Sequence, residues 1–355
     1  MAGAVQLPYK TPWFTFAQES AAACLAMRGH PTAYNAILNQ CTALSFNGRF
    51  TESGAGSQMG ISRSRICNFP CLEQYTISFR FGLPYCREII RELLLKGYYI
   101  YYRGVDDYDL PGKNGYGHRH GRQDGILCGY DDNDGTYRVA ALDCDWLFRP
   151  IWLPQECFAE GLRDCLARGA YSSFTAYRMR NTRVGLNEKQ ILRYLREYTD
   201  ADVEAGTERF LPTGHGTVEG IGAQELLAVY LGKLADGEIP LYQADRQALC
   251  TVWEHKRCML DRLTALERRR GWGQSFGSRY RPLVDAAYRN RMLYAVCCQK
   301  RRPELLGKIR DGLRAGKAAE RAILLDFLRA AEENGALIPH RGSSAAQSGN
   351  VARSR

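Results

Sequence analysis

The sequence predicts an α+β protein in which an antiparallel sheet precedes a helical region. Near residue 185 the chain changes from mixed strand and helix patterns to almost continuous helical spacing of its apolar residues. Within the first half, two apolar runs joined by an Asp-Gly turn at 134–135 are typical of a β-hairpin. A chain of 355 residues with 45% hydrophobic residues is long enough for two domains, each with its own core. We therefore expect domains at 1–184 and 185–340, followed by a small, polar, disordered tail at 341–355.

The elements of the first half follow from local patterns. Residues 84–96 predict a short helix that ends at Gly97, and an aromatic strand follows over 98–102. The Asp-rich turn at 131–135 fixes the hairpin, because Asp and Gly accept the backbone geometry of a tight turn. The other elements expected here are strands over 125–130, 136–142 and 172–180 and a helix over 154–168.

Almost every element expected after residue 185 is a helix. Loops rich in Gly and Pro separate the helices, and no fixed-period repeat is present. The segment 244–269 spaces its large apolar residues as one face of a helix that packs into a bundle core. The expected helices span 187–198, 222–235, 244–269, 282–299, 303–315 and 317–335.

Several classes of protein are not expected from this sequence. No run of ~18 apolar residues predicts a membrane span, and the N-terminus lacks the basic start and apolar run of a signal peptide, which favours a cytoplasmic protein. The 13 cysteines are odd in number and lack the spacing of a zinc site, so most are expected to be small buried hydrophobic residues. We expect neither a metal nor a cofactor.

The positive charge of the chain is concentrated in one segment. Residues 267–321 hold 15 basic and 5 acidic residues, which equals the whole net charge of +10. Such a surface attracts phosphate polymers or acidic proteins, although a solvated helical face is an equally good interpretation. Nucleic acid is not the expected partner, because the sequence carries no helix-turn-helix, zinc-finger or RNA-recognition signature.

The hairpin region 118–145 is the best candidate for a chemical site. His120 precedes the first strand and Asp143 follows the second, so the hairpin could set an imidazole beside an orienting carboxylate. Cys24 is the candidate nucleophile, because a thiolate at a helix N-terminus has a lowered pKa. Gln18 could donate a hydrogen bond to a developing oxyanion. The plainer alternatives are a buried structural cysteine and a solvated histidine loop.

The stretch IYYRGVDDYDLPGKNGYGHRHGRQDGILCGYDD, with the following RVAALD and IWLPQECF, resembles a bacterial papain-like group. This group includes the N-terminal domain of the butirosin-biosynthesis acyltransferase and bacteriocin-processing cysteine peptidases. The resemblance covers roughly residues 15–180 and implies a papain-like fold for the first domain. It also implies acyl transfer from a carrier-protein thioester to a small-molecule amine, in natural-product or antibiotic biosynthesis. The catalytic residues that it implies are Cys24, His120, Asp143 and Gln18.

The sequence departs from the family pattern at both catalytic positions. The histidine of papain-like enzymes usually precedes its strand where Gln123 stands here, three residues after His120. An alternative alignment places Ser20 at the position of the nucleophile and makes Cys24 a non-catalytic cysteine. Two functions therefore stay open. The first is a cysteine-dependent acyltransferase that docks an acyl or peptidyl carrier protein on the basic segment 267–321. The second is a catalytically degenerate papain-like accessory or substrate-binding protein.

Overall fold

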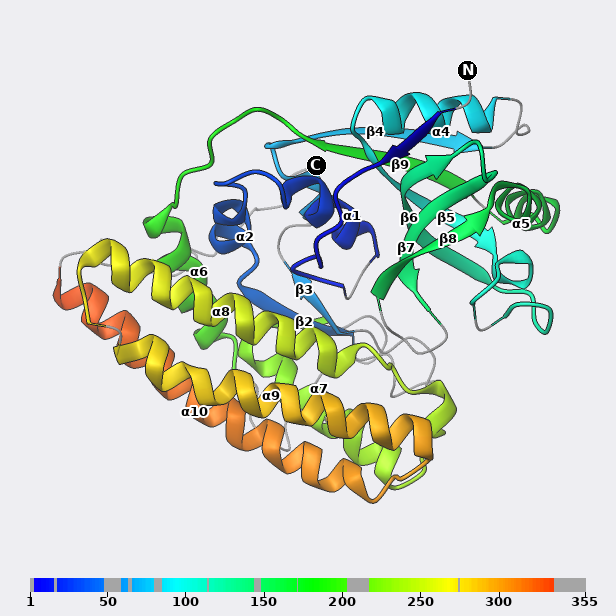
Figure 1. Ribbon diagram of the computed structural model, residues 1–355. Coiled ribbons are helices and arrows are strands. Elements are labelled where there is room, and N and C mark those ends of the chain that lie inside the picture. The colour runs from blue at the N-terminus through cyan, green and yellow to red at the C-terminus, as the bar shows by residue number, and fades with distance from the viewer. Residues whose placement is uncertain are drawn as a thin grey trace, which may run out of the picture.

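A computed structural model describes residues 3–15, 18–47, 59–62, 66–79, 85–113, 115–143, 148–170, 172–202, 217–273 and 275–334. The fold is α+β, with an antiparallel sheet in the first half and a helical region after it (Figure 1). The predicted tail 341–355 lies outside the described residues. Among the described helices, none combines the length and apolarity needed to cross a membrane.

The main sheet is antiparallel throughout and has the strand order β4-β9-β5-β6-β7-β8, with β1 added beside β6. The predicted hairpin forms β6 and β7, and its turn lies between Asp131 and Thr136. Strand β9 is the last strand of this sheet in chain order, and it lies between β4 and β5. The sheet therefore contains residues from almost the whole first half of the chain. Its strands are β1 (Ala4–Gln6), β4 (Leu72–Phe79), β5 (Tyr99–Asp106), β6 (Arg122–Asp131), β7 (Thr136–Leu142), β8 (Phe148–Pro154) and β9 (Ser172–Met179).

Helices cover both faces of this sheet (Figure 1). Side chains alternate between the two faces along each strand, so neighbouring tyrosines of β5 are divided between two cores. Tyr99 and Tyr101 pack with α1 (Gln18–Met27), whereas Ile100 and Tyr102 pack with α4 (Cys86–Leu95) and α5 (Gln155–Ala167). Helices α1 and α5 therefore lie on opposite sides of the sheet.

The second half is helical and packs against the first through one helix in particular. The long helix α8 (Ala248–Arg270) contacts α2 (Tyr34–Gln40) and β3 (Met59–Ser62) on one side and α9 (Ser275–Lys300) on the other (Figure 1). A small sheet also joins the halves, because β10 (Thr217–Glu219) pairs with β2 (Ala43–Asn47), which pairs with β3. The remaining helices are α6 (Glu188–Asp200), α7 (Ala223–Ala235) and α10 (Leu305–Glu333).

One hydrophobic core crosses the predicted boundary at residue 184. It contains Trp13 and Cys24 from the first half together with Leu263 and Phe327 from the second. The apolar face predicted for 244–269 is confirmed, and its six large residues are buried in α8 (Leu249, Val252, Met259, Leu260, Leu263 and Leu266). Apolar contacts of this kind stabilise the two halves together. The domain boundary at residue 184 stays a prediction.

Two helix boundaries differ from the predicted ones. The segments 303–315 and 317–335 form the single helix α10, which continues through Gly316. A glycine inside a helix costs ~1 kcal/mol, and burial of the apolar face of α10 outweighs this cost. The sequence predicted a helix that starts at Pro282, but helix α9 begins seven residues earlier, at Ser275. A proline inside a helix removes one backbone hydrogen bond, and tertiary packing of Tyr280 offsets that loss here.

Candidate functional site

The structure places Cys24 inside a helix and away from solvent. Helix α1 starts at Gln18, so Cys24 is its seventh residue and the predicted position at a helix N-terminus is wrong. The side chain is 0% exposed, and burial raises the pKa of its thiol to about 12. The thiol is therefore protonated at neutral pH, which is the inert state of a cysteine.

Gln18 and Ser20 belong to the first turn of the same helix. Six residues of helix rise about 9 Å, so Gln18 does not lie beside the thiol of Cys24 as an oxyanion donor would. Ser20 is 8% exposed. Between them, Glu19 accepts a hydrogen bond of 2.9 Å from the hydroxyl of Tyr177 on β9. A carboxylate thus stands at the start of α1.

His120 is bound to an aspartate, but to a different one from that predicted. Its Nδ1 lies 3.1 Å from Oδ2 of Asp106, and its ring stacks on Tyr108 with centroids 4.3 Å apart. Burial works to raise the pKa of Asp106, but hydrogen bonds from the backbone N–H groups of Tyr108 and Gly121 and from His120 hold it below its usual value. The orienting carboxylate of His120 is therefore Asp106, the last residue of β5, and not the predicted Asp143.

The sheet separates His120 from Cys24. The ligand atoms of His120 lie within 4.8 Å of those of Asp164, which belongs to α5 on one face of the sheet. Cys24 belongs to α1 and to the core on the other face. The structure therefore does not join the predicted nucleophile and base into a dyad.

Asp143 has a cationic partner at the end of β7. Its carboxylate forms an ion pair with Arg149, and Lys113 Nζ donates a 2.7 Å hydrogen bond to the neighbouring carbonyl of Leu142. Asp143 is 4% exposed. His120 contacts Asp106 of β5, whereas Asp143 pairs with Arg149 at the edge of the sheet.

The register of β6 decides which side chain faces α1. Gln123, where the papain-like resemblance would imply a histidine, donates a 3.2 Å hydrogen bond to Asp107. The next residue, Asp124, accepts a 2.7 Å hydrogen bond from the hydroxyl of Tyr101, on the face that packs with α1. Burial raises the pKa of Tyr101, and the charges of Asp124 and Glu19 raise it further, so both carboxylates lie near this hydroxyl. Carboxylates and tyrosines therefore lie on the face of the sheet that packs with α1.

The described residues contain one group with metal-ligand geometry, formed by Asp106, His120 and Asp164. Arg168 Nε lies 3.5 Å from Oδ2 of Asp106 and already supplies positive charge there. The backbone N–H groups of Tyr108 and Gly121, His120 and the guanidinium of Arg168 all contact the carboxylate of Asp106. We infer that these contacts of Asp106 hold the loop before β6 in place.

A cavity of about 420 Å³ lies where residues 11–15 meet α8 and α9. This volume is within the range of small-molecule binding sites. Its lining is mainly apolar and includes Leu142, Phe148, Leu249, Met292, Ala295 and Val296. The cavity is therefore a second candidate site, formed by residues from both halves of the sequence.

Glu254 is a buried carboxylate in the lining of this cavity. Its Oε1 accepts hydrogen bonds from the backbone N–H of Thr15 at 2.8 Å and from the Thr15 hydroxyl at 2.6 Å. Its Oε2 has no hydrogen-bond partner among the described residues. Burial raises the pKa of Glu254 to about 7, against the lowering effects of Thr15, Arg291 and Arg257. Glu254 therefore exchanges its proton near physiological pH, as groups at functional sites often do.

Two arginines in the cavity lining stack on one tryptophan. The guanidinium carbons of Arg257 and Arg291 each lie 4.6 Å from the ring centroid of Trp253. Both arginines are half-buried, and among the described residues no carboxylate comes within 4.0 Å of either. The cavity thus combines apolar walls with two oriented cations.

No protein-family model and no curated protein matches this chain. The resemblance of the first half to papain-like enzymes therefore stays a hypothesis. The residues of the cavity were not predicted as a site, although helical spacing places Trp253 and Arg257 one turn apart on the same side of a helix. Arg291 contacts Trp253, and Thr15 contacts Glu254, from segments that are distant in the sequence. The spacing of residues along one helix does not indicate such contacts.

We expect Glu254→Gln to stabilise the protein at pH 8. The folded-state pKa of Glu254 is above that of the unfolded chain, so the unfolded state binds fewer protons and stability falls as pH rises from about 4.5 to about 7. Glutamine removes this penalty and still accepts the hydrogen bonds of Thr15. We predict a gain of roughly 2 kcal/mol in the free energy of unfolding at pH 8 and little gain at pH 4, measured by urea denaturation. Equal effects at both pH values would contradict the buried, titrating carboxylate.

Proposed function

We propose that the chain is a small-molecule binding protein on a papain-like scaffold, and not a cysteine-dependent acyltransferase. The observation that carries the proposal is the apolar cavity between residues 11–15, α8 and α9. Pockets of this size with a few convergent polar groups are the usual sites of ligand binding. Such a protein would act as an accessory factor that binds a substrate or product of a biosynthetic reaction.

The place of Cys24 supports binding over covalent catalysis. Acyl transfer through a thioester needs a thiolate that the substrate can reach and a base that takes its proton. Cys24 is buried with its pKa raised to about 12, and His120 lies across the sheet. Docking of a carrier protein on 267–321 also stays a prediction. Several basic residues there have acidic partners, among them Arg279 with Asp326 and Arg314 with Glu225.

The binding proposal is tested with a neutral apolar fluorophore, N-phenyl-1-naphthylamine. We expect saturable binding to the wild-type protein, and binding about tenfold weaker to Ala295→Trp, in which an indole occupies the cavity. Ala295 is exposed on α9, so this substitution leaves the core intact. The matched control is Asp285→Trp, an exposed position of the same helix outside the cavity lining. Equal affinities of all three proteins would exclude the cavity as the binding site.

A thiol-labelling experiment separates binding from acyl transfer. After brief treatment of the native protein with a thiol reagent, peptide mass spectrometry identifies the labelled residues. We expect Cys24 to react far more slowly than the partly exposed Cys157, and at a rate below that of a free thiol. Rapid labelling of Cys24, together with acyl transfer from an acyl-carrier thioester that Cys24→Ala abolishes, would instead establish the acyltransferase.

A further inference from the structure

Two of the three arginines in the cavity lining, the half-buried Arg257 and Arg291, form no ion pair with a described carboxylate. A charged group that leaves water is normally paired, because its desolvation costs free energy. Arg257 and Arg291 contact the face of Trp253 instead, and no described carboxylate lies within salt-bridge distance of them. On the same helices, Lys256 pairs with Glu320 and Arg279 pairs with Asp326. Glu254 in the same cavity acts on both arginines electrostatically but forms no ion pair with them, and an acidic group on a ligand would supply that ion pair.

We infer that the ligand of the cavity is an organic anion with an apolar body, whose acidic group is bound by Arg257 and Arg291. This inference rests on the proposed binding function and names its ligand class. The guanidinium groups offer planar, paired donors that fit a carboxylate, sulfonate or phosphate group. The apolar walls formed by Leu249, Val296 and their neighbours would surround the body of the molecule.

Trp253 sets the position of both cations. Stacking on an indole fixes the plane of a guanidinium, so less side-chain freedom is lost when the anion binds. Arg257 reaches the ring from the next turn of α8, whereas Arg291 reaches it from α9. The exposed ring of Tyr288 lies 5.6 Å from that of Trp253 and continues the aromatic surface beyond the arginines. The anion site is therefore assembled by the packing of α8 on α9.

Glu254 couples this binding to a proton. Among the described residues, the charged and titratable groups that act on it are Arg257 on α8, Arg291 on α9, and two thiols, Cys24 on α1 and Cys250 on its own helix, while Arg246 and Cys298 line the same cavity. Burial raises the pKa of both thiols to about 12, so they stay neutral between pH 6 and 8. The arginines stay charged. Glu254 alone changes charge in this range, and its ionised form would repel a bound anion.

A matched pair of probes tests the ligand class. 8-Anilino-1-naphthalenesulfonate and N-phenyl-1-naphthylamine share one apolar body and differ by a sulfonate. We expect the anionic probe to bind the wild type about tenfold more tightly than the neutral one, and Arg257→Gln or Arg291→Gln to remove most of this difference. The affinity of the neutral probe should change less than about twofold in these variants. Arg289→Gln, an exposed arginine of α9 outside the cavity lining, is the control for loss of charge.

The pH dependence tests the role of Glu254. Affinity for the anionic probe should fall on the order of fivefold between pH 6 and pH 8, and this fall should vanish in Glu254→Gln. The affinity of the neutral probe should not change with pH. Persistence of the fall in Glu254→Gln would overturn the proton coupling.

The outcomes separate this inference from the proposed function. If Ala295→Trp blocks the neutral probe but both probes bind the wild type equally well and the arginine variants change nothing, the cavity binds neutral apolar molecules and the inference is overturned. If Ala295→Trp has no effect on either probe, the proposed function itself fails. Thermal unfolding of the Ala295→Trp and arginine variants within about 2 °C of the wild type, and of Glu254→Gln at no lower temperature than the wild type, shows that the comparison concerns binding and not folding.

Discussion

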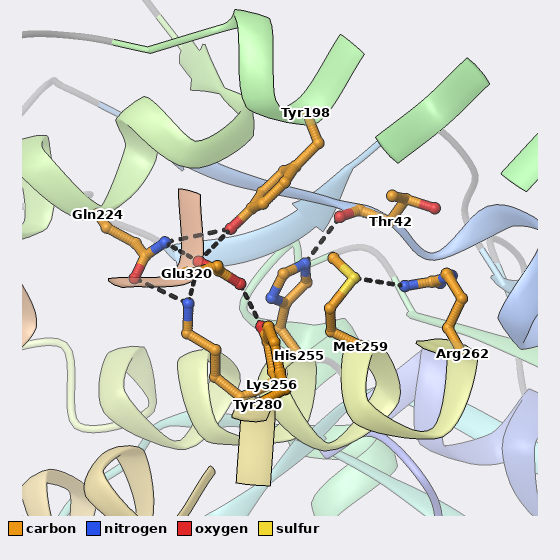
Figure 2. Close-up of polar contacts among 9 residues, drawn as sticks. All are labelled: Thr42, Tyr198, Gln224, His255, Lys256, Met259, Arg262, Tyr280 and Glu320. Atoms are coloured by element: carbon orange, nitrogen blue, oxygen red, sulfur yellow. Dashed lines mark hydrogen bonds and ion pairs between the residues drawn. The ribbon is translucent and has the colours of Figure 1, made fainter. Parts of the chain in front are cut away.

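A Lys256→Met variant is expected to lose about 3–5 kcal/mol of unfolding free energy. Lys256 of α8 forms a fully buried ion pair with Glu320 of α10 (Figure 2). Methionine keeps the length and apolar stem of lysine but leaves the carboxylate of Glu320 buried without its cation. Urea denaturation monitored by circular dichroism measures the loss.

The large effect follows from the network around Glu320, which joins five helices (Figure 2). Tyr198 of α6 donates a 3.0 Å hydrogen bond to Oε2, Gln224 of α7 donates one of 2.7 Å to the same atom, and Tyr280 of α9 donates to Oε1. Burial works to raise the pKa of Glu320, but Lys256 and His255 hold it below its usual value, so the carboxylate is charged in the folded protein. Loss of the ammonium removes the main compensation for that buried charge.

The controls separate burial of the pair from the loss of a lysine. Lys96→Met removes an exposed lysine that pairs with Glu92 one turn away, and it should cost less than about 0.5 kcal/mol. The double variant Lys256→Met/Glu320→Gln should be less destabilised than the sum of the single variants, because neither charge is left unpaired. Additive losses would show that the two side chains contribute independently and would contradict the network.

An Arg262→Lys variant should lose roughly 2–4 kcal/mol, although the charge is conserved. Arg262 is 0% exposed in α8, and its guanidinium binds the end of α2. Nε donates a 2.8 Å hydrogen bond to the carbonyl of Leu38, and Nη2 donates one of 2.8 Å to that of Cys41. A lysine ammonium cannot reach both carbonyls in this fork geometry, so acceptors at the C-terminus of α2 would be buried without donors.

The measurement for Arg262 combines stability with local exchange. Besides the loss in urea denaturation, amide hydrogen exchange should accelerate in α2 and in the following strand β2, since α8 holds this part of the first half through Arg262. Arg268→Lys, an exposed arginine of the same helix, should change stability by less than about 0.5 kcal/mol. A loss confined to α8, with α2 unaffected, would contradict the role of this side chain in joining the halves.

The main outline of the fold follows from local sequence patterns. The Asp-Gly turn and its flanking apolar runs predicted β6 and β7, and the helical spacing after residue 185 predicted the helical region, because these signals arise within about ten residues of the chain. The boundaries of α9 and α10 were not predicted. Pro282 and Gly316 are helix-breaking signals by themselves, and the packing of neighbouring helices overrides them.

The sequence by itself determined which groups with chemical potential are present: Cys24, His120 and their acidic neighbours in the first half, and the basic segment in the second. Tertiary structure decided which of them meet. Cys24 lies inside α1 and is buried by packing in the core, the alternation of β6 turns Asp124 toward α1, and the sheet separates Cys24 from His120. The contact of Thr15 with Glu254, 239 residues apart, likewise exists only in the folded chain. Local spacing specifies helices and strands, whereas a site depends on distances across the core that only packing fixes.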